Sequence, residues 1–387
     1  MHPGQAVVRE GKALVYLPRV EDAVYKGSLE PSWLRVFYNP RMTLNRDLSV
    51  AALQAYIDLY APHKPVNVVE PLTATGVRPV RYALEVEGVG FIYASDIDRE
   101  AVRLAKLNAE SNGASNVLLF HSDARALLYK LKTLRTPILV VDIDPFGSPA
   151  PFLQAALEAL GDKGMIAATA TDLAVLEGSK SRAAYRKYWA RIVRVPPSKE
   201  IAVRVLLGYM ARVAASLDKS LHPLLSYYEG HYIRVYALVE RGARAADKML
   251  GEHVGYAYHC DDKGYTGLVE PPCDNAREIG PLWTGGLWDK RYLERVYHEA
   301  SRRRYLQSRD SLLKLLDIII EEAEVDGFIH QRIDALASAL RTSMPKRRRL
   351  LEALRSMGYN AVRTHFTPVG FRSNAPIEAL TRVFKPF

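Results

Sequence analysis

The sequence predicts an α/β fold built on a parallel, doubly wound sheet, and two observations carry that prediction. Apolar runs of strand length alternate with helix-length segments of amphipathic spacing along the first half of the chain. Four successive runs also end at or near acidic residues. Because ligands of parallel sheets bind beyond the carboxyl ends of the strands, the acids indicate a binding cleft at that edge.

The expected elements can be placed in order. A helical pattern opens at Asn45 and runs to residue 60, and later helices are expected at 79–87, 99–112, 124–132 and 200–218. Strands are expected at 66–70, 90–95 and 117–121, in the run that ends at Asp144, and at 164–169. Asp98 is expected to cap the helix that follows it, because its side chain can accept a backbone N–H bond. The acids at the strand ends are Glu70, Asp96, Asp123, Asp142 and Asp144.

A second domain is expected after His222 and Pro223, where the pattern changes. Residues 226–239 alternate like a single strand rich in tyrosine. The tail beyond residue 302 contains helical segments and then a strand at 360–367, which suggests a winged-helix-like end. We therefore expect a first domain over residues 1–222, with an amino-terminal extension, and an α+β domain over residues 223–387.

The size and charge of the chain restrict its partners. A length of 387 residues suggests two or three domains of about 150 residues. The net charge of +10 favours a polyanionic partner, because Lys and Arg displace counterions from phosphates; a basic surface kept for solubility is the alternative. No apolar run reaches the roughly 18 residues of a membrane span, and no signal-peptide segment is evident. A cytoplasmic location without membrane contact is therefore expected.

The most informative motif is Asp142-Ile-Asp-Pro-Phe-Gly-Ser-Pro149. It closes a run of β-branched and apolar residues that is typical of a buried parallel strand. Such a strand delivers the Asp144 carboxylate, the rigid Pro145 turn and the Phe146 ring to one place. This combination suits a planar nitrogen base, since the ring can stack on the base and the acid can accept a proton from its amino group.

The loop after the first strand indicates the cofactor. A nicotinamide-binding loop needs Gly-x-Gly-x-x-Gly, and Gly76 is the only glycine in residues 70–78. Asp96 nevertheless ends the second strand, where an acid binds ribose hydroxyls. A ribose-binding acid without a pyrophosphate loop fits S-adenosylmethionine better than NAD.

Four further side chains are candidates for contacts with that cofactor. Asp123 and Ala124 follow the third strand and would meet the adenine, with Asp123 accepting from its amino group. Arg46 and Arg78 could pair with the carboxylate of the ligand. The alternative for each arginine is a surface ion pair.

Six motifs together resemble one known family. They are Val36-Phe-Tyr-Asn-Pro-Arg-Met-Thr-Leu-Asn-Arg-Asp-Leu-Ser49, Ala74-Thr-Gly-Val-Arg-Pro-Val-Arg81, the motif that begins at Asp142, Thr169-Ala-Thr-Asp172, His231-Tyr-Ile-Arg-Val-Tyr236 and Gly280-Pro-Leu-Trp283. Their combination covers nearly the whole chain and resembles the Trm1 family, the tRNA (guanine-26-N2)-dimethyltransferases. Asp-Pro-Phe alone would indicate only an amino-methyltransferase of some kind.

The resemblance implies a fold, an activity and a set of site residues. The fold would be a Rossmann-like, S-adenosylmethionine-dependent methyltransferase domain followed by a family-specific carboxyl-terminal domain. The activity would be methyl transfer to the exocyclic N2 of guanine 26 in tRNA. By position, the cofactor contacts are Arg46, Arg78, Asp96, Asp123 and Ala124, the catalytic residues are Asp144, Pro145 and Phe146, and Phe37 matches an aromatic that helps to hold the target base.

The two cysteines depart from the pattern of many proteins resembling this chain, which carry two Cys pairs for structural zinc. Cys260 and Cys273 have no CxxC partners, and two cysteines make no disulfide framework. We expect no metal and two buried thiols that pack as small hydrophobes. Zinc held with the help of His259 and nearby acids is the alternative.

Binding of tRNA requires contacts with its phosphates, and three basic segments are candidates. These are residues 302–304, residues 346–349 with Arg347 and Arg348, and Arg363; a solvated helix face is the alternative for each. No protein partner is expected to be required. A DNA or small-molecule amino-methyltransferase, or a non-catalytic RNA-binding protein on the same scaffold, are the alternative functions.

Overall fold

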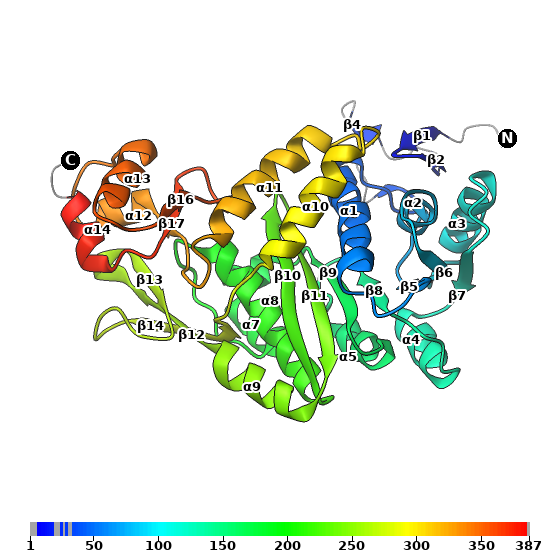
Figure 1. Cartoon of the computed structure of the whole chain (residues 1–387), viewed down its shortest axis with the longest axis horizontal. Coiled ribbons are helices and arrows are strands. Elements are labelled where there is room, and N and C mark those ends of the chain that lie inside the picture. Colours follow the sequence, from blue (N-terminus) through cyan, green and yellow to red (C-terminus); the bar gives the residue numbers. More distant parts are fainter. Residues whose placement is uncertain (1–5, 19–23, 26–27, 30–32, 385–387) are drawn as a thin grey trace. The chain divides into compact units, whose positions relative to one another are not determined.

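Figure 1 shows the computed structural model of the chain, in which residues 6–18, 24–25, 28–29 and 33–384 are described. The chain divides into two compact units. The first unit holds Met1–Pro145, Pro151–Ala168 and Glu294–Lys314, and the second holds Phe146–Ala150, Thr169–Leu293 and Leu315–Phe387. The expected boundary after residue 222 falls inside strand β10 (Lys219–Glu229), and a division there stays a prediction.

The first unit contains the parallel sheet that the alternating pattern predicts. Its strands are β5 (Val66–Glu70), β6 (Val89–Asp96), β7 (Val117–His121), β8 (Val140–Ile143) and β9 (Gly164–Ala170), whose last two residues belong to the second unit. They follow one another in space in the order β9-β8-β5-β6-β7, and each neighbouring pair is parallel. Every residue of β8 and β9 is buried, as expected of parallel strands covered on both faces.

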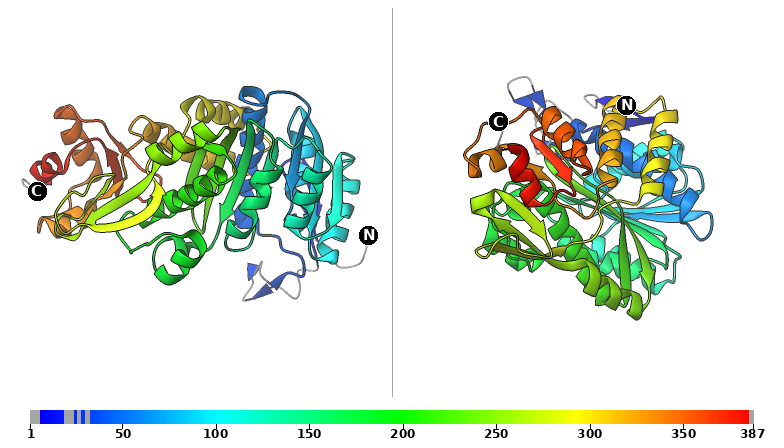
Figure 2. Two further views of the ribbon diagram at one scale, coloured as in Figure 1. Left: turned by 90° about the horizontal axis from the view of Figure 1, so that it is seen from below. Right: turned by 60° about the vertical axis from the view of Figure 1, so that its left-hand side comes forward.

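Helices alternate with these strands, which confirms the predicted α/β class. They are α1 (Thr43–Leu59), α2 (Val77–Glu85), α3 (Arg99–Ser111), α4 (Ala124–Thr133) and α5 (Ala150–Ala159). Helix α3 lies beside β6 and β7 in the cyan part of Figures 1 and 2. Asp98 caps α3 by accepting a 2.8 Å bond from the backbone N–H of Glu100, as predicted. Helix α2 begins two residues earlier than expected, because Gly76 takes a left-handed conformation (φ 73°) as its N-cap.

The first 45 residues contain short strands that the sequence did not reveal. Strands β1 (Val7–Glu10) and β2 (Ala13–Tyr16) form an antiparallel hairpin, and β3 (Val24–Tyr25) pairs with β4 (Ser28–Leu29). The backbone of β2 is attached to α3 by two amide side chains. Asn108 bonds the N–H and C=O of Tyr16 at 2.7 and 3.1 Å, and Asn112 bonds those of Leu14 at 2.8 and 2.7 Å.

The first unit also receives a late segment of the chain. Helix α10 (Lys290–Arg302) and the start of α11 (Arg309–Ala323) supply residues 294–314. The Ser308 N–H donates to Asp47 at 2.7 Å, and Arg303 donates to Gln54 at 3.2 Å. The basic segment 302–304 is thus partly used inside the protein, since both Arg302 and Arg303 also pair with Glu299.

The second unit contains an antiparallel hairpin where a single strand was expected. Residues 226–239 do not form one strand: β10 pairs with β11 (Tyr232–Arg241), and Gly230 turns between them at a φ of 52°. The turn lies at Glu229-Gly230-His231, between the two tyrosine-containing segments that were expected to form one strand. The other elements in this part of the unit are α6 (Leu173–Leu176), α7 (Ser181–Tyr188), α8 (Ser198–Ala215), α9 (Ala243–His253), β12 (Val254–Cys260), η4 (Asp261–Lys263), β13 (Tyr265–Leu268) and β14 (Arg277–Trp283).

The carboxyl-terminal part of the second unit combines helices with a small antiparallel sheet. Its elements are β15 (Gln331–Arg332), α12 (Ile333–Ala339), α13 (Arg347–Ser356), β16 (Ala361–Arg363), β17 (Gly370–Ser373) and α14 (Ile377–Phe384), with the sheet in the order β15-β17-β16. Apolar side chains of these helices and strands share one core. Helices and a hairpin are therefore present, and a winged-helix-like end stays a prediction.

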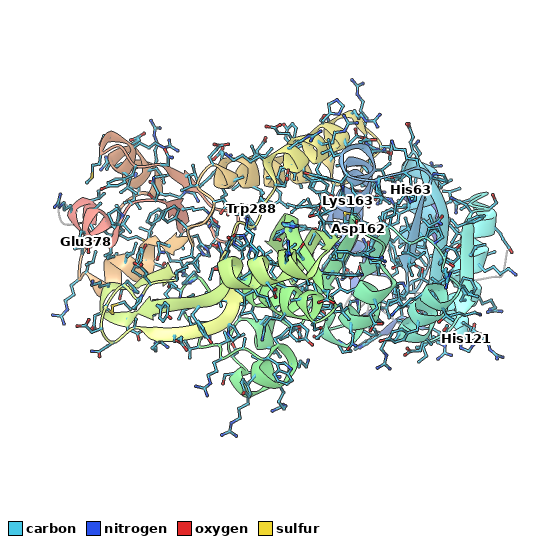
Figure 3. All side chains as sticks on the ribbon, turned by 60° about the horizontal axis from the view of Figure 1, so that its bottom comes forward. His63, His121, Asp162, Lys163, Trp288 and Glu378 are labelled. Carbon is cyan, nitrogen blue, oxygen red and sulfur yellow. A yellow bond between two sulfur atoms is a disulfide. The ribbon has the colours of Figure 1, made fainter. Side chains whose placement is uncertain are left out.

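A buried ionic cluster joins several elements of the second unit. Arg372 pairs with Glu200 at 2.8 Å and with Glu322 at 3.2 Å, and all three side chains are fully buried. The ring of Trp288, which is labelled in Figure 3, lies 5.0 Å from the Arg372 guanidinium, and its N–H donates to the Ser226 carbonyl at 2.8 Å.

The expectation of two buried free thiols is wrong. Cys260 and Cys273 form a disulfide with a Cα–Cα distance of 6.0 Å. Residues 260 and 273 end β12 and precede β14, and β12 pairs with both β13 and β14, so the sheet brings the two cysteines together. Across the described residues, no group of three or more His, Cys, Asp or Glu side chains has the arrangement of a metal site. Nor does any helix of the described chain have the length and apolar character needed to cross a bilayer.

Candidate active site

Arg78 is the centre of the polar cluster at the carboxyl ends of the strands. It lies on α2, is 4% exposed, and donates to the Asp144 carboxylate. It also donates to Ser49 Oγ at 2.6 Å and Asn45 Oδ1 at 2.9 Å, both on α1. Because α1 and α2 bring these groups to the end of β8, the Asp144 carboxylate is held by a buried cation.

Two further carboxylates approach the same guanidinium. Glu70, the last residue of β5, lies 3.9 Å from Arg78, and Asp142 of β8 lies 3.8 Å from it. Asp142 also accepts a 2.7 Å bond from the Tyr82 hydroxyl. Burial raises the pKa of Glu70 to about 8; Arg78 acts against this increase, while the charge of Asp142 adds to it.

The two carboxylate oxygens of Asp144 differ in their contacts. Its Oδ2 accepts from Arg78, while Oδ1 has no hydrogen-bond partner among the described residues. The side chain is 19% exposed, in contrast to Asp142 at 1%. The arrangement therefore positions one carboxylate oxygen and leaves the other available to a substrate.

Asp96 organises the loop that follows β5. Its Oδ2 accepts from the Ala74 N–H at 2.9 Å and its Oδ1 from the Asp98 N–H at 2.9 Å. Ala74 and Gly76 both have a positive φ, of 46° and 73°, so the loop is tightly turned. Asp96 lies at the end of β6 as predicted, and binding of a ribose stays a prediction.

Asp123 and Ala124 begin α4. Asp123 is the N-cap, and its Oδ1 accepts from the N–H of Arg125 at 2.9 Å and of Ala126 at 3.2 Å. Slight burial raises the pKa of Asp123, but hydrogen bonds from Arg125 and Ala126 outweigh this and lower it. Ala124 is buried at the first position of the helix. Their contact with an adenine stays a prediction.

Arg46 has a strong partner inside the protein. Its Nε and Nη2 donate to the two oxygens of Glu10 at 2.6 and 2.7 Å, and Tyr38 donates to the same carboxylate at 2.9 Å. Burial raises the pKa of Glu10, yet Arg46, followed by Arg81, outweighs burial and lowers it to about 2. Arg46 therefore forms an ion pair, as one of the two alternatives predicted, but the pair is buried and not at the surface. A contact between Arg46 and the ligand carboxylate stays a prediction.

The remaining site residues lie in both units. Phe146 follows Asp144 and Pro145 directly in the chain, belongs to the second unit, and is 72% exposed. The next residue, Gly147, exchanges two 2.8 Å hydrogen bonds with Thr171. Phe37 is half-buried in the first unit. The stacking role of Phe146 and the base-holding role of Phe37 both stay predictions.

The basic residues predicted to bind tRNA already have partners within the second unit. Arg347 donates to the Pro368 carbonyl at 2.6 Å, and Arg348 pairs with Glu352 at 2.8 Å. Arg363 forms a bidentate pair with Glu321 at 2.8 and 3.0 Å. Their role in RNA binding stays a prediction.

The residues around Arg78 fit the amino-acid part of S-adenosylmethionine. Three buried polar atoms, Glu70 Oε2, Thr73 Oγ1 and Asn45 Nδ2, make no hydrogen bond of normal geometry among the described residues, although Thr73 lies near enough to Glu70 to act against the increase of its pKa. Two of these atoms can accept from an ammonium group and one can donate to a carboxylate. Since buried polar groups are normally paired, an α-amino acid would satisfy what the protein leaves open.

Comparison with known proteins agrees with this chemistry. The family model of the N2,N2-dimethylguanosine tRNA methyltransferases matches residues 18–385. A protein of Aeropyrum pernix named tRNA (guanine(26)-N(2))-dimethyltransferase is 43% identical, over 96% of this chain and 94% of its own length. A protein of the same name from Saccharolobus solfataricus is 38% identical over 98% of both chains.

A solved structure extends the likeness to three dimensions. It is Trm1 from Pyrococcus horikoshii in complex with S-adenosyl-L-methionine. The two chains superpose with a TM-score of 0.86 and 33% identity, over 98% of this chain and 99% of the other. The match therefore covers both units. This chain belongs to the family of N2,N2-dimethylguanosine tRNA methyltransferases.

Proposed function

We propose that this chain transfers methyl groups from S-adenosylmethionine to the exocyclic N2 of guanine 26 in tRNA, with Asp144 as the proton acceptor. Membership of the family and the near full-length match to named guanine-26 dimethyltransferases support the reaction. The single observation that supports the role of Asp144 is its geometry, with one oxygen held by buried Arg78 and the other left without a partner among the described residues.

The cofactor would occupy the carboxyl ends of β5, β6 and β7. S-adenosylmethionine supplies the methyl group, on a positively charged sulfonium. Glu70, Thr73 and Asn45 would hold its amino-acid part, because their unpaired atoms match an ammonium and a carboxylate. Asp96 would bind the ribose and Asp123 the adenine amino group, each with lone pairs that its backbone hydrogen bonds do not use.

Asp144 would act on the acceptor nitrogen. The exocyclic amine of guanine is a weak nucleophile, because its lone pair delocalises into the ring. As the nitrogen gains the methyl group, it must lose one proton for each transfer. Asp144 Oδ1 would accept that proton or pass it to water, while Arg78 keeps the carboxylate in position. The transfer also requires the guanine N2 to lie in line with the sulfonium methyl group, with the nitrogen about 3–3.5 Å from the methyl carbon.

Pro145 and Phe146 would hold the guanine. The Pro145 carbonyl would accept the second amine hydrogen. The exposed Phe146 ring offers a flat surface for stacking. A guanine within folded tRNA must leave its stack to reach such a site, which costs a few kcal/mol that phosphate contacts have to offset.

The expected cellular location and partners of the enzyme follow from its tRNA substrate. We place the enzyme in the cytoplasm, where it would act on tRNA without a membrane and without a protein partner. The net charge of +10 supports direct binding of the RNA.

The test is to incubate the purified chain with tRNA and S-adenosylmethionine and to map methylated nucleosides by mass spectrometry. N2-methyl- and N2,N2-dimethylguanosine should appear at position 26, and a transcript with adenine at that position should stay unmodified. Calorimetric titration with the cofactor separates the alternative of a non-catalytic RNA-binding protein, which would show no heat of binding. Methylation at another nucleotide alone would overturn the assignment of position 26.

A further inference from the structure

Helix α7 lies in a basic stretch of the second unit. Between Gly178 and Lys199 the chain contains seven Lys and Arg residues and no Asp or Glu. Four exposed residues of α7 and its C-cap, Arg182, Tyr185, Arg186 and Trp189, follow the spacing i, i+3, i+4 and i+7. This spacing places them along one side of the helix. We call these four residues the α7 face.

The cations of the α7 face are free of acidic partners. Neither Arg182 nor Arg186 has a carboxylate within 4 Å among the described residues, whereas Arg348 and Arg363 are both paired with glutamates. An arginine without a protein partner keeps all its donors for a ligand. Many residues of this unit are positively charged. The absence of a carboxylate partner is what distinguishes Arg182 and Arg186 from arginines such as Arg348 and Arg363.

The aromatic rings of the α7 face are unusually exposed. Tyr185 is 56% exposed and Trp189 is 66% exposed. Trp189 also takes a left-handed conformation (φ 53°, ψ 36°) that glycine or asparagine adopts with less strain. Arg212 holds this turn by donating to the carbonyls of Tyr188 and Trp189 at 2.7 and 3.3 Å. A large ring that is both strained and exposed suggests a function outside folding.

Helix α7 is attached to the loop that carries Phe146, within the second unit. The buried Tyr188 hydroxyl is 2.6 Å from Ser148 Oγ and donates to Asp172 at 2.8 Å. The Thr171 N–H donates to the Gly147 carbonyl, and the Gly147 N–H donates to Thr171 Oγ1, next to Asp172. A ligand on the α7 face would thus be held at a defined position relative to Phe146.

We propose that the α7 face binds the tRNA strand next to the target guanine. Arg182 and Arg186 bind its phosphates, and Tyr185 and Trp189 stack on nucleotides that lose their neighbours when the guanine leaves its stack. Alternating cations and aromatic rings suit this partner, since single-stranded RNA offers phosphates and the faces of unstacked bases. The inference rests on the proposed function, because it takes tRNA as the substrate.

Trp189→Asn is the sharpest test of the stacking residue. Asparagine tolerates the left-handed conformation, so the melting temperature should stay the same or rise, while affinity for tRNA should fall about 5- to 100-fold. Trp189→Phe should keep most of the affinity, because it keeps a ring. A residue with only a structural role would not combine unchanged folding with weaker RNA binding.

The charged residues are tested with a matched pair of double variants. Arg182→Gln with Arg186→Gln removes two charges at i, i+4 on α7, and Arg244→Gln with Lys248→Gln removes two charges at the same spacing on the exposed side of α9. Only the α7 pair should reduce the slope of log affinity against log salt, by about 1.4 for two single-strand phosphates. An equal effect of both pairs would mean that net charge alone acts, and would overturn the proposal.

The outcomes for the face and for the reaction are distinguishable. If the wild-type chain methylates guanine 26 but the α7 variants bind tRNA as tightly as it does, the proposed function stands and the α7 face is not an RNA contact. If the wild-type chain binds no tRNA, both fail. Affinity for S-adenosylmethionine, measured by calorimetry on each variant, should not change.

Discussion

At the scale of single residues, one cation is shared by three acids. Arg78 carries one positive charge, and Glu70, Asp142 and Asp144 together carry up to three negative charges. Removing these groups from water makes the excess negative charge costly, so the most buried site that lacks a full partner retains a proton. Glu70, whose pKa is raised to about 8, is that site. The cluster therefore contains more carboxyl groups than its single cation can neutralise.

Replacement of Asp144 should remove catalysis and leave the fold intact. In Asp144→Ala the amine loses its proton acceptor, so methyl transfer should fall by at least about 100-fold, the lower end of the usual contribution of general bases. Arg78 keeps Glu70 and Asp142 within 4 Å, so cofactor affinity should stay within a few fold. Single-turnover methylation and calorimetric titration measure the two effects.

Asp144→Asn is the control for this prediction, because asparagine keeps the shape of the side chain and one carbonyl oxygen. It should be as inactive as the alanine variant if proton acceptance is the role of Asp144. Activity that survives in either variant would show that another group takes the proton.

Binding of the cofactor should release a proton from Glu70. A ligand ammonium beside this carboxyl would lower its pKa from about 8, so binding near pH 7 should release close to one proton. Affinity should accordingly rise with pH until about 8. Calorimetry in buffers of different ionisation enthalpy measures the released protons, and Glu70→Gln should release fewer by about one. Equal proton release by both proteins would place the ammonium elsewhere.

The sequence could place the acids of the site but not their partners. The position of each acid follows from where a strand ends, which is a local property. Which side chains surround it depends on contacts between distant segments, such as Glu10 with Arg46 or Arg78 with Asn45. Glu10 was missed for this reason, and no local pattern marks it. The free cations of α7 were missed because the sequence does not show which arginines are paired.

At the scale of elements, repeated local patterns were predictable and long-range pairing was not. Strand β5 and strand β7 have the expected limits, because turn residues and a change of period bound them on both sides. The sequence prediction made the β10–β11 hairpin one strand, although the polar Glu229-Gly230-His231 turn separates its two apolar segments. The disulfide was also unpredictable, because residues 260 and 273 meet only through the register of β12, β13 and β14.

The loop between β5 and α2 depends on glycine at position 76. Gly76→Ala would force alanine into a left-handed conformation and bring its Cβ within 2.8 Å of the Ala105 Cβ and 3.0 Å of its Cα. The variant should lose about 2–4 kcal/mol of unfolding free energy, measured in urea, and bind the cofactor more weakly. Gly113→Ala is the matched control, since Gly113 has a similar φ of 65° and no atom lies within 4 Å of the added Cβ.

The two glycine variants separate conformational strain from a clash. Gly113→Ala should cost only about 1–2 kcal/mol and leave cofactor affinity unchanged. If Gly76→Ala is no worse than Gly113→Ala, then α3, which carries Ala105, can move away from residue 76, and close packing against this helix does not determine the shape of the loop.

At the scale of the whole molecule, each unit has its own buried ionic cluster. In the first unit Arg46 and Arg81 surround Glu10, and Arg81 also pairs with Asp47 at 2.7 Å. In the second unit Arg372 joins Glu200 and Glu322. Burial raises the pKa of both second-unit glutamates, but Arg372 and, for Glu322, chiefly His365 outweigh burial and lower it. At Glu10, Glu200 and Glu322 the folded chain therefore binds fewer protons than the unfolded chain, whereas burial raises the pKa of Asp47.

Acid should consequently remove the stability that Glu10, Glu200 and Glu322 contribute. A carboxyl group with a lowered pKa in the fold contributes stability above its unfolded pKa of about 4.5, and that stability is lost as the pH falls toward the folded value, about 2 for Glu10. The unfolding free energy in urea should decrease steadily from pH 5 to pH 3.

Glu10→Gln tests the contribution of this carboxyl group. The variant should lose about 3–5 kcal/mol of unfolding free energy at pH 7, because Arg46 and Arg81 lose a buried partner. The slope of its unfolding free energy with pH below pH 5 should be smaller than that of the wild type by close to one proton. Glu110→Gln, which removes one exposed glutamate from α3, should follow the wild type at every pH. If Glu10→Gln keeps the slope of the wild type, Glu10 does not have a lowered pKa, and the hairpin of β1 and β2 is not attached through an ionised glutamate.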